Sequence, residues 1–302
     1  MTEATVVMTR VGPDLDGVAS AIGYAELIEA RAWLPGEMDA EARYVYDRCG
    51  APRRAADEDV AGCHRFILVD ASGLSAFPEN VDPHDVIEVI DHRAHHRATI
   101  DFPGAAIDIQ PVGAAATLIA ERFRHADQTP SPQSMVLLYA AIMSNTQSLL
   151  GSVTTPRDRQ AAEELRRRGH IPADLLDRQF AARRAAIVAD LASALRRESK
   201  RYDDPRGPYV VTQLELTGAT DLLREQMPQL REALGQFGDR TMLNMVDPST
   251  GSSSLLIPDQ AFRNEVSTRL SISFDRGAAG FERALLRKQI VARLAGATWS
   301  SQ

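Results

Sequence analysis

The chain has 302 residues, enough for one large domain or two of ordinary size. Its 44% hydrophobic and 25% charged residues are typical of a soluble globular protein, and its net charge of -7 argues against a general nucleic-acid or membrane-surface binder. No apolar run approaches a membrane helix, the start lacks the features of a signal peptide, and Cys49 and Cys63 stand in no metal or redox spacing. We therefore expect a cytoplasmic protein with reduced, buried thiols.

Short β-rich runs alternate with helical patterns through the first half of the chain. Residues 4–9 read as a strand that stops at Gly12-Pro13, and a helical pattern follows over 18–32. Further strands are predicted at 43–46, 65–69, 85–90 and 106–109.

Helices dominate from 112 to 201. Apolar residues recur at the spacing of one helix face over 132–143, 157–167 and 185–195, which predicts amphipathic helices there. Strands that alternate with helices predict an α/β fold, with a parallel sheet covered by helices on both faces.

The composition changes at 196–208, which is charged and then rich in proline and glycine. We interpret this stretch as a helix end followed by an interdomain linker. The prediction is a first domain over 1–195, a linker over 196–207 and a smaller α/β domain over 208–302. In the smaller domain we expect strands at 209–214, 241–246 and 253–257 and a helix at 221–234.

Two carboxylates, Asp14 and Asp16, stand just after the first strand. Acids spaced so closely repel one another, which raises one pKa unless the two share a cation. A hard divalent ion would relieve the repulsion, and oxygen-rich sites suit Mg²⁺ or Mn²⁺. The alternative is that one aspartate caps the following helix while the other is solvated. These residues alone leave both interpretations open.

Two further strands end in side chains that can carry chemistry. Asp70 follows one buried strand, and Asp91-His92-Arg93 follows the next. Open α/β sheets bind ligands at the carboxyl ends of their strands, and histidine is a common metal ligand. Taken alone, Asp70 is a weak signal, and the second segment could be a polar surface turn. Together, three strands that bring acids or histidine to one sheet edge predict a divalent-metal site. The guanidinium of Arg93 beside it can contact phosphate, which indicates a phosphate-containing substrate.

Two more segments lie at predicted helix ends. Residues 110–117 contain small side chains at the predicted start of a helix. Small side chains allow another group to approach the backbone closely, and a helix N-terminus attracts anions. Packing of an alanine-rich helix explains the same residues almost as well. The triplet Ser144-Asn145-Thr146 follows an apolar helix and is by itself typical of a C-terminal cap.

These five segments, in this order, resemble the motifs of the DHH phosphoesterase superfamily. Within it the chain is most similar to the manganese-dependent family II inorganic pyrophosphatases and the prune-type proteins. The ordered set is specific, although no single motif is, and the resemblance spans nearly the whole chain. The matching segments are Arg10 to Asp16, Leu68 to Asp70, Asp91 to Arg93, Pro111 to Gly113 with Thr117, Ile142 to Thr146, and Arg287 to Val291.

The resemblance implies a doubly wound parallel-sheet DHH domain and a smaller C-terminal α/β domain, with the active site in the cleft between them. It implies two Mn²⁺ or Mg²⁺ ions that bridge a water, which attacks phosphorus. Asp14 and Asp70 would hold one ion, and Asp16, Asp70 and His92 the other. Asn145 would contribute an amide oxygen. The resemblance also implies a possible homodimer through the N-terminal domain.

The resemblance further implies which residues act on the substrate. Asp70, His92 and Arg93 would serve in catalysis. The residues that would bind the phosphates are Arg10, Arg93, Arg287 and Lys288. For Arg287 and Lys288 the alternative is a solvated basic helix face.

The sequence departs from the family pattern at positions that matter. Arg10 replaces the first-motif histidine, and a guanidinium that stays protonated is no metal ligand. Arg93 replaces the second histidine of Asp-His-His, as in prune-type proteins, and Asn145 replaces an aspartate. Leu286 replaces an arginine of the substrate segment. We therefore expect one retained metal site and a doubtful second one, where Arg10 either grips phosphate or pairs with Asp14 in place of the metal.

Two functions follow. The first is a divalent-metal-dependent phosphohydrolase that acts on pyrophosphate-like, polyphosphate or small nucleotide phosphoester bonds. The alternative is a catalytically degenerate family member that binds a phosphorylated ligand without hydrolysing it. Neither function involves a membrane or general nucleic-acid binding.

Overall fold

The structure is a computed structural model that describes residues 4–51, 54–93 and 97–296. The chain forms two compact units, Met1–Ala182 and Arg183–Gln302. The division falls within helix α8 (Leu175–Ala189), earlier than the predicted boundary at 195. The segment 196–207, which we predicted as a linker, contains the end of α9 (Leu191–Arg197) and strand β6 (Ser199–Tyr202). Because β6 pairs with β7 (Tyr209–Glu215), residues 199–202 of this stretch are part of the second unit's sheet.

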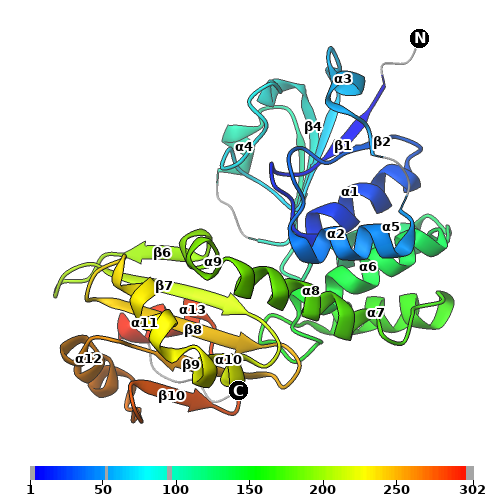
Figure 1. The fold of residues 1–302 in the computed structure, drawn as a ribbon. Helices are drawn as coiled ribbons and strands as arrows, with labels where there is room; N and C mark the ends of the chain where they lie inside the picture. Colours follow the sequence, from blue (N-terminus) through cyan, green and yellow to red (C-terminus); the bar gives the residue numbers. More distant parts are fainter. Residues whose placement is uncertain (1–3, 52–53, 94–96, 297–302) are drawn as a thin grey trace. The chain divides into compact units, whose positions relative to one another are not determined.

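The first unit is built on a five-stranded sheet in the order β2-β1-β3-β4-β5, and every neighbouring pair is parallel (Figure 1). This confirms the predicted parallel α/β fold. The strands are β1 (Val6–Met8), β2 (Arg31–Trp33), β3 (Phe66–Val69), β4 (Val86–Asp91) and β5 (Ala106–Ile109).

The two faces of this sheet are covered differently. Side chains alternate between the faces along a strand, so Val7 and Ile67 pack into the core beneath the long helices, whereas Val6 and Met8 pack on the opposite side with Phe102. Short helices and loops cover that second face. The long helices are α1 (Leu15–Leu27), α2 (Ala40–Cys49), α5 (Ala115–His125), α6 (Pro132–Asn145) and α7 (Pro156–Arg168); the short ones are α3 (Asp57–Val60) and α4 (Ala98–Asp101).

Two local predictions were wrong. The helix expected over 18–32 ends at Leu27, and its last residues form β2 instead. The strand expected at 43–46 lies inside α2. Asp39 caps that helix by accepting a hydrogen bond from the Ala42 amide, and Gly50 ends it in the left-handed conformation at φ 60°. Four residues are too few for side-chain periodicity to distinguish a strand from a helix. The two caps, which lie outside the predicted strand, therefore indicate the helix better than its own side chains do.

The second unit contains a mixed sheet in the order β10-β9-β8-β7-β6, in which β7 and β8 are parallel and the other pairs are antiparallel. Leu214 and Met245 face one core, with α10 and α11, whereas Val211 and Met242 face another, with α12 and α13. The remaining elements are β8 (Thr241–Asp247), β9 (Ser252–Leu256), β10 (Ala278–Phe281), α10 (Ala219–Glu225), α11 (Met227–Gly235), α12 (Gln260–Leu270) and α13 (Arg287–Leu294).

Two expectations from composition can be compared with the structure. Across the described residues, we find no helix with both the length and the apolar character needed to cross a bilayer. Cys49 and Cys63 are free thiols, and both are half-buried rather than fully buried.

Candidate metal centre

Three strands of the first sheet end side by side at the candidate site. In the parallel register, Met8 of β1 lies beside Leu68 of β3, and Val69 lies beside Ile90 of β4. The residues that follow these strands therefore emerge at the same sheet edge. The sequence places an aspartate or histidine after each strand, as predicted.

The structure brings three of the predicted residues together. One ligand atom from each of Asp16, Asp70 and His92 lies within 4.8 Å of the other two. The His92 Nε2 atom is 3.5 Å from Asp70 Oδ1 and 3.8 Å from Asp16 Oδ2. Both carboxylates are buried, with 1% of Asp16 and none of Asp70 exposed. Two buried acids and an imidazole around one point form a suitable donor set for a divalent cation.

The orientation of His92 supports this assignment. Its Nδ1 atom lies 3.1 Å from the carbonyl oxygen of Val112. Because a carbonyl can only accept, Nδ1 carries a proton there, and a neutral ring then presents the lone pair of Nε2 to the two carboxylates. His92 Nε2 and Asp70 Oδ2 are buried and have no hydrogen-bond partner among the described residues. Buried polar atoms need partners, and a cation between these atoms would satisfy both.

The electrostatics of the three residues lead to the same conclusion. Burial raises the pKa of Asp16, and the nearby charge of Asp70 raises it further. Burial likewise raises the pKa of Asp70. Burial disfavours the charged form of His92, but the two carboxylates outweigh this effect and raise its pKa. Two buried carboxyl groups this close therefore stay ionised together only if positive charge lies between them, which a metal ion or a protonated His92 can supply.

Asp16 is also a structural residue. Its carboxylate accepts hydrogen bonds of 2.8 Å from the backbone amides of Ala115 and Ala116 at the start of α5. Asn145, the last residue of α6, donates its Nδ2 atom to Asp16 Oδ2 at 2.6 Å. Asn145, which we predicted as a ligand, thus contacts the cluster as a donor that holds Asp16. The segment of small residues predicted to open a helix lies directly on this carboxylate.

Asp14 lies outside the three-residue cluster. Its Oδ2 atom accepts a hydrogen bond of 2.9 Å from Arg10 Nη2, and its Oδ1 atom accepts one of 3.1 Å from the Gly17 amide as the N-cap of α1. Burial would raise the pKa of Asp14, but Arg10 and the Gly17 amide outweigh it and lower the pKa to about 2. Helix capping and the Arg10 ion pair, the two alternatives left open by the sequence, both occur at this residue.

Arg93 holds Asp70 at two points. Its Nη2 atom lies 2.8 Å from Asp70 Oδ1 and 3.0 Å from the Asp70 carbonyl oxygen. Asp70 has a φ of 54°, a left-handed conformation that a non-glycine residue adopts at a cost of about 1 kcal/mol. The Arg93 side chain is 55% exposed, so part of its guanidinium can reach a ligand in solvent.

Comparison with known proteins identifies the unit that carries this cluster. The family described as "DHH family, N-terminal domain" matches residues 4–142. Residues 4–142 are a DHH-family domain. This match covers the carboxyl ends of β1, β3 and β4, and with them Asp16, Asp70 and His92.

Curated relatives extend the similarity beyond the DHH domain. The chain is 32% identical over 169 residues to a Shouchella clausii protein named "probable manganese-dependent inorganic pyrophosphatase", and it spans only about half (53%) of that relative's length. It is 27% identical over 285 residues, 88% of each chain, to a manganese-dependent inorganic pyrophosphatase from Methanothrix thermoacetophila.

A solved structure shows the same fold. The crystal structure of a Methanococcus jannaschii protein assigned to the family II inorganic pyrophosphatases matches 96% of this chain and 98% of its own, with a TM-score of 0.68 and 21% identity. The predicted two-part α/β architecture is therefore that of a known protein structure.

Two further aspartates support the DHH-domain site: Asp91, which the sequence had already placed in the segment Asp91-His92-Arg93, and Asp158, which sequence reasoning missed. Asp91 accepts hydrogen bonds from the His92 amide at 2.7 Å and from Ser72 Oγ at 2.5 Å, which fixes the turn after β4. Asp158, which is fully buried, accepts from the Gly113 amide and from Thr117 Oγ1. A capping-box pattern marks Asp158 as the start of α7, but its contact with Gly113 spans 45 residues and has no local signal.

Gly113 allows the close backbone approach that the sequence predicted. A Cβ atom at this position would lie 2.6 Å from Thr146 Cγ2 and 3.0 Å from Asp158 Oδ2. Only glycine fits without displacing these neighbours, so Gly113 packs the segment that carries Val112 against the end of α6.

The predicted phosphate-binding residues Arg287 and Lys288 lie at the start of α13 in the second unit. The Arg287 amide donates to Gln213 Oε1 at 2.6 Å, and its guanidinium donates to the Glu198 carbonyl. Lys288 is exposed. Their role in substrate binding stays a prediction.

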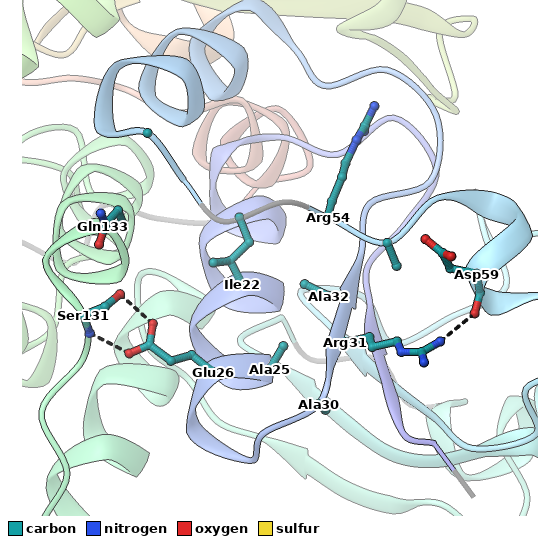
Figure 2. Close-up of a pocket in the computed structure, with 12 residues that line it drawn as sticks. Ile22, Ala25, Glu26, Ala30, Arg31, Ala32, Arg54, Asp59, Ser131 and Gln133 are labelled. Atoms are coloured by element: carbon teal, nitrogen blue, oxygen red, sulfur yellow. Dashed lines mark hydrogen bonds between the residues drawn. The ribbon is translucent and has the colours of Figure 1, made fainter.

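A separate cavity of about 770 Å³ lies in the first unit, and Figure 2 shows the residues that line it. Its floor is apolar, with Ile22 and Ala25 from the later turns of α1, and its rim includes Arg31 and Arg54. The cluster lies at the beginning of α1 and at the carboxyl ends of the strands, whereas Arg31 begins β2. The cavity and the cluster share no residue.

Proposed function

We propose that this protein is a divalent-metal-dependent phosphohydrolase of the DHH family, acting on pyrophosphate or a related short phosphate chain. The observation that carries the proposal is the convergence of Asp16, Asp70 and His92, with two buried ligand atoms that have no other partner among the described residues. Relatives named as manganese-dependent inorganic pyrophosphatases support both the metal and the substrate class.

In this proposal Asp16, Asp70 and His92 hold one Mn²⁺ or Mg²⁺ ion. Such an ion would offset negative charge on the phosphoryl group and make a nearby water more acidic. The side chains are pre-oriented for this task, because Val112 fixes the ring of His92 and Arg93 fixes Asp70. A second ion would have to displace Arg10 from Asp14, so we propose a single resident ion.

The arginines at this edge of the sheet would bind the substrate. Phosphate oxygens pair well with guanidinium groups, which present parallel N–H donors. Arg93 is 55% exposed and Arg10 is 34% exposed, so each retains donors that face solvent while one nitrogen holds an aspartate. Asp70, His92 and Arg93 are thus the proposed catalytic residues. Arg287 and Lys288 are proposed as further phosphate contacts.

The test measures phosphate release from pyrophosphate, tripolyphosphate and small nucleotides, with Mn²⁺ or Mg²⁺ added to the metal-stripped protein. We expect metal-dependent turnover on at least one substrate, and a loss of at least about a hundredfold in Asp70→Asn and His92→Gln. Asp47→Asn is the matched control, because it neutralises an exposed carboxylate on α2 outside the cluster. Equal rates in Asp70→Asn and the control would refute the proposal.

A second candidate is a family member that binds a phosphorylated ligand without hydrolysing it. Two contacts favour it. Arg10 forms an ion pair with Asp14, the carboxylate that would otherwise be free to bind a second ion. Asn145 donates a hydrogen bond to Asp16 through its amide nitrogen, so its oxygen is not the atom that faces the cluster. Calorimetry of a non-hydrolysable pyrophosphate analogue (imidodiphosphate) distinguishes the two functions. Tight binding without turnover of any tested substrate would support the second candidate, and a metal-dependent rate would remove it. A cytoplasmic location and a homodimer through the first unit stay predictions.

A further inference from the structure

A second group of basic residues lies in the C-terminal unit, around a polar cavity of about 530 Å³. Arg263 comes from α12, Arg231 comes from α11, and Arg276 comes from the turn before β10. Asn264 and Ser267 line the same cavity from α12. Because Arg263 and Ser267 are four residues apart on a helix, both face the cavity from one side.

Two of the guanidinium groups converge on one point. A Cβ atom built on Gly277 would lie 2.6 Å from Arg231 Nη2 and 2.7 Å from Arg263 Nη1, so these nitrogens lie close together. Gly277 has a φ of 90°, which favours glycine, and the missing side chain leaves room for both groups. The absence of a side chain at Gly277 thus lets two like charges lie close together, where they repel each other unless an anion binds between them.

Neutral oxygens, rather than carboxylates, hold these arginines: backbone carbonyl groups and, for Arg263 Nη2, the side-chain amide oxygen of Gln260. Arg231 Nη2 donates to the Arg276 carbonyl at 2.6 Å, and Arg263 Nη1 donates to the Ile257 carbonyl at 2.9 Å. Among the described residues, no acidic group forms an ion pair with any of the three. By contrast, Arg240 and Arg269 in the same unit both pair with Glu265.

The guanidinium groups carry more N–H donors than there are acceptors among the described residues around them. A guanidinium carries five N–H donors, yet Arg231 makes one hydrogen bond with the described residues, and its buried Nε has no acceptor. The Arg276 side chain makes no hydrogen bond or ion pair within the described part of the chain. Three positive charges thus face a polar cavity that lacks a negative partner.

We infer that this cavity binds a compact polyanion, namely the phosphate chain of a small molecule. Arginines are suited to phosphate oxygens because their donors are parallel and their charge is permanent. The charges surround one hollow rather than forming a stripe along the surface, and the chain carries a net charge of -7, which favours a short phosphate chain over nucleic acid. This inference is independent of the proposed hydrolysis, because it uses no residue of the metal cluster.

The experiment is calorimetric titration of the full-length protein with sodium tripolyphosphate in EDTA, which prevents metal-dependent turnover. Arg276→Gln is the main variant, because it removes one charge without removing a hydrogen bond seen in the structure. We expect its dissociation constant to rise about tenfold, and that of Arg263→Gln to rise at least as much. Arg197→Gln and Arg224→Gln are the matched controls, since each removes one exposed arginine charge elsewhere in the unit.

Thermal unfolding of every variant separates a lost binding site from a lost fold. If Arg276→Gln binds tripolyphosphate more weakly than the wild type but unfolds at the same temperature, the site is supported. The inference is wrong if wild-type protein binds no tripolyphosphate, if Arg276→Gln binds as tightly as the two controls, or if sulfate binds as tightly as tripolyphosphate. A parallel titration with ATP identifies the source of the phosphate chain: tighter binding of ATP indicates a nucleotide, and tighter binding of tripolyphosphate indicates an inorganic chain.

Discussion

Arg10 Nη2 lies 2.9 Å from Asp14 Oδ2, and this ion pair engages the carboxylate that the family resemblance assigns to a second metal ion. The pair also explains why Asp14 is separate from the cluster of Asp16, Asp70 and His92, although Asp14 and Asp16 are only two residues apart. A positive side chain here does part of the charge compensation that a cation would do. The number of ions bound is therefore open to a direct test at this position.

Replacing Arg10 with histidine should restore a second metal site. The substitution frees Asp14 and adds a neutral nitrogen ligand. We expect the Mn²⁺ content after equilibrium dialysis, measured by mass spectrometry, to rise from one ion per chain to two. Arg48→His, on the exposed end of α2, is the control and should keep one ion. An unchanged content in Arg10→His would show that Asp14 cannot act as a ligand.

Gly113→Ala should destabilise the first unit by about 1–3 kcal/mol, because the new methyl group would overlap Thr146 Cγ2. The urea midpoint measures this loss. Thr146→Ser removes the methyl group and keeps the hydroxyl that donates to the Ile142 carbonyl. Gly113→Ala should therefore cost less in the Thr146→Ser background. An equal cost in both backgrounds would contradict the steric explanation.

The ion pair between Asp108 and Arg122 should make stability depend on pH. Burial would raise the pKa of Asp108, but hydrogen bonds from Gln110 and Arg122 outweigh it and lower the pKa. A lowered folded-state pKa means that the carboxylate stabilises the fold above its unfolded pKa of about 4, and that this stability is lost as the pH falls through the folded value.

Asp108→Asn should thus cost about 1 kcal/mol or less at pH 6, since the carboxylate is one-third exposed. The cost should shrink as the pH falls below the unfolded pKa of about 4 and should vanish below the lowered folded pKa. Urea unfolding of both proteins from pH 6 downwards provides the measurement, and 1 M NaCl should reduce the difference at pH 6. A cost that stays constant with pH would indicate that the ionised form contributes nothing.

Cys49 should react slowly with alkylating reagents. Burial raises the pKa of its thiol to about 11, and the thiolate is the reactive form. At pH 8 the thiolate fraction is about a hundredfold smaller than for a thiol with the usual value of 9.0. Iodoacetamide labelling of Cys63→Ser, followed by mass spectrometry, isolates Cys49. Labelling in 8 M urea is the control and should be rapid, whereas fast labelling of the folded protein would contradict the burial argument.

The positions of Asp16, Asp70 and His92 were predictable because Asp70 and His92 closely follow strands whose apolar runs are visible in the sequence, and Asp16 lies in the first turn of the helix after the first strand. Parallel pairing then places them at one edge without further information. The conformation of 43–46 was not predictable from its side chains, since the caps at Asp39 and Gly50 decide it.

The contacts that hold the site together were not predictable for a different reason, although Asn145 itself was a predicted site residue. Asn145 contacts Asp16 across 129 residues, and Asp158 contacts Gly113 across 45. Such contacts depend on how α5, α6 and α7 pack, which local patterns do not encode. The sequence likewise left open whether Arg10 grips phosphate or pairs with Asp14, because both require the same residue.

The double role of Asp16 bears on how related sequences should be compared. Its carboxylate anchors the first amides of α5 and also forms part of the metal cluster. A descendant that lost catalysis would still need Asp16 to hold that helix in place, so selection for folding alone can preserve it. His92 Nε2 has no such second task among the described residues. Across relatives, retention of this histidine is therefore a better marker of a working metal site than retention of the aspartate.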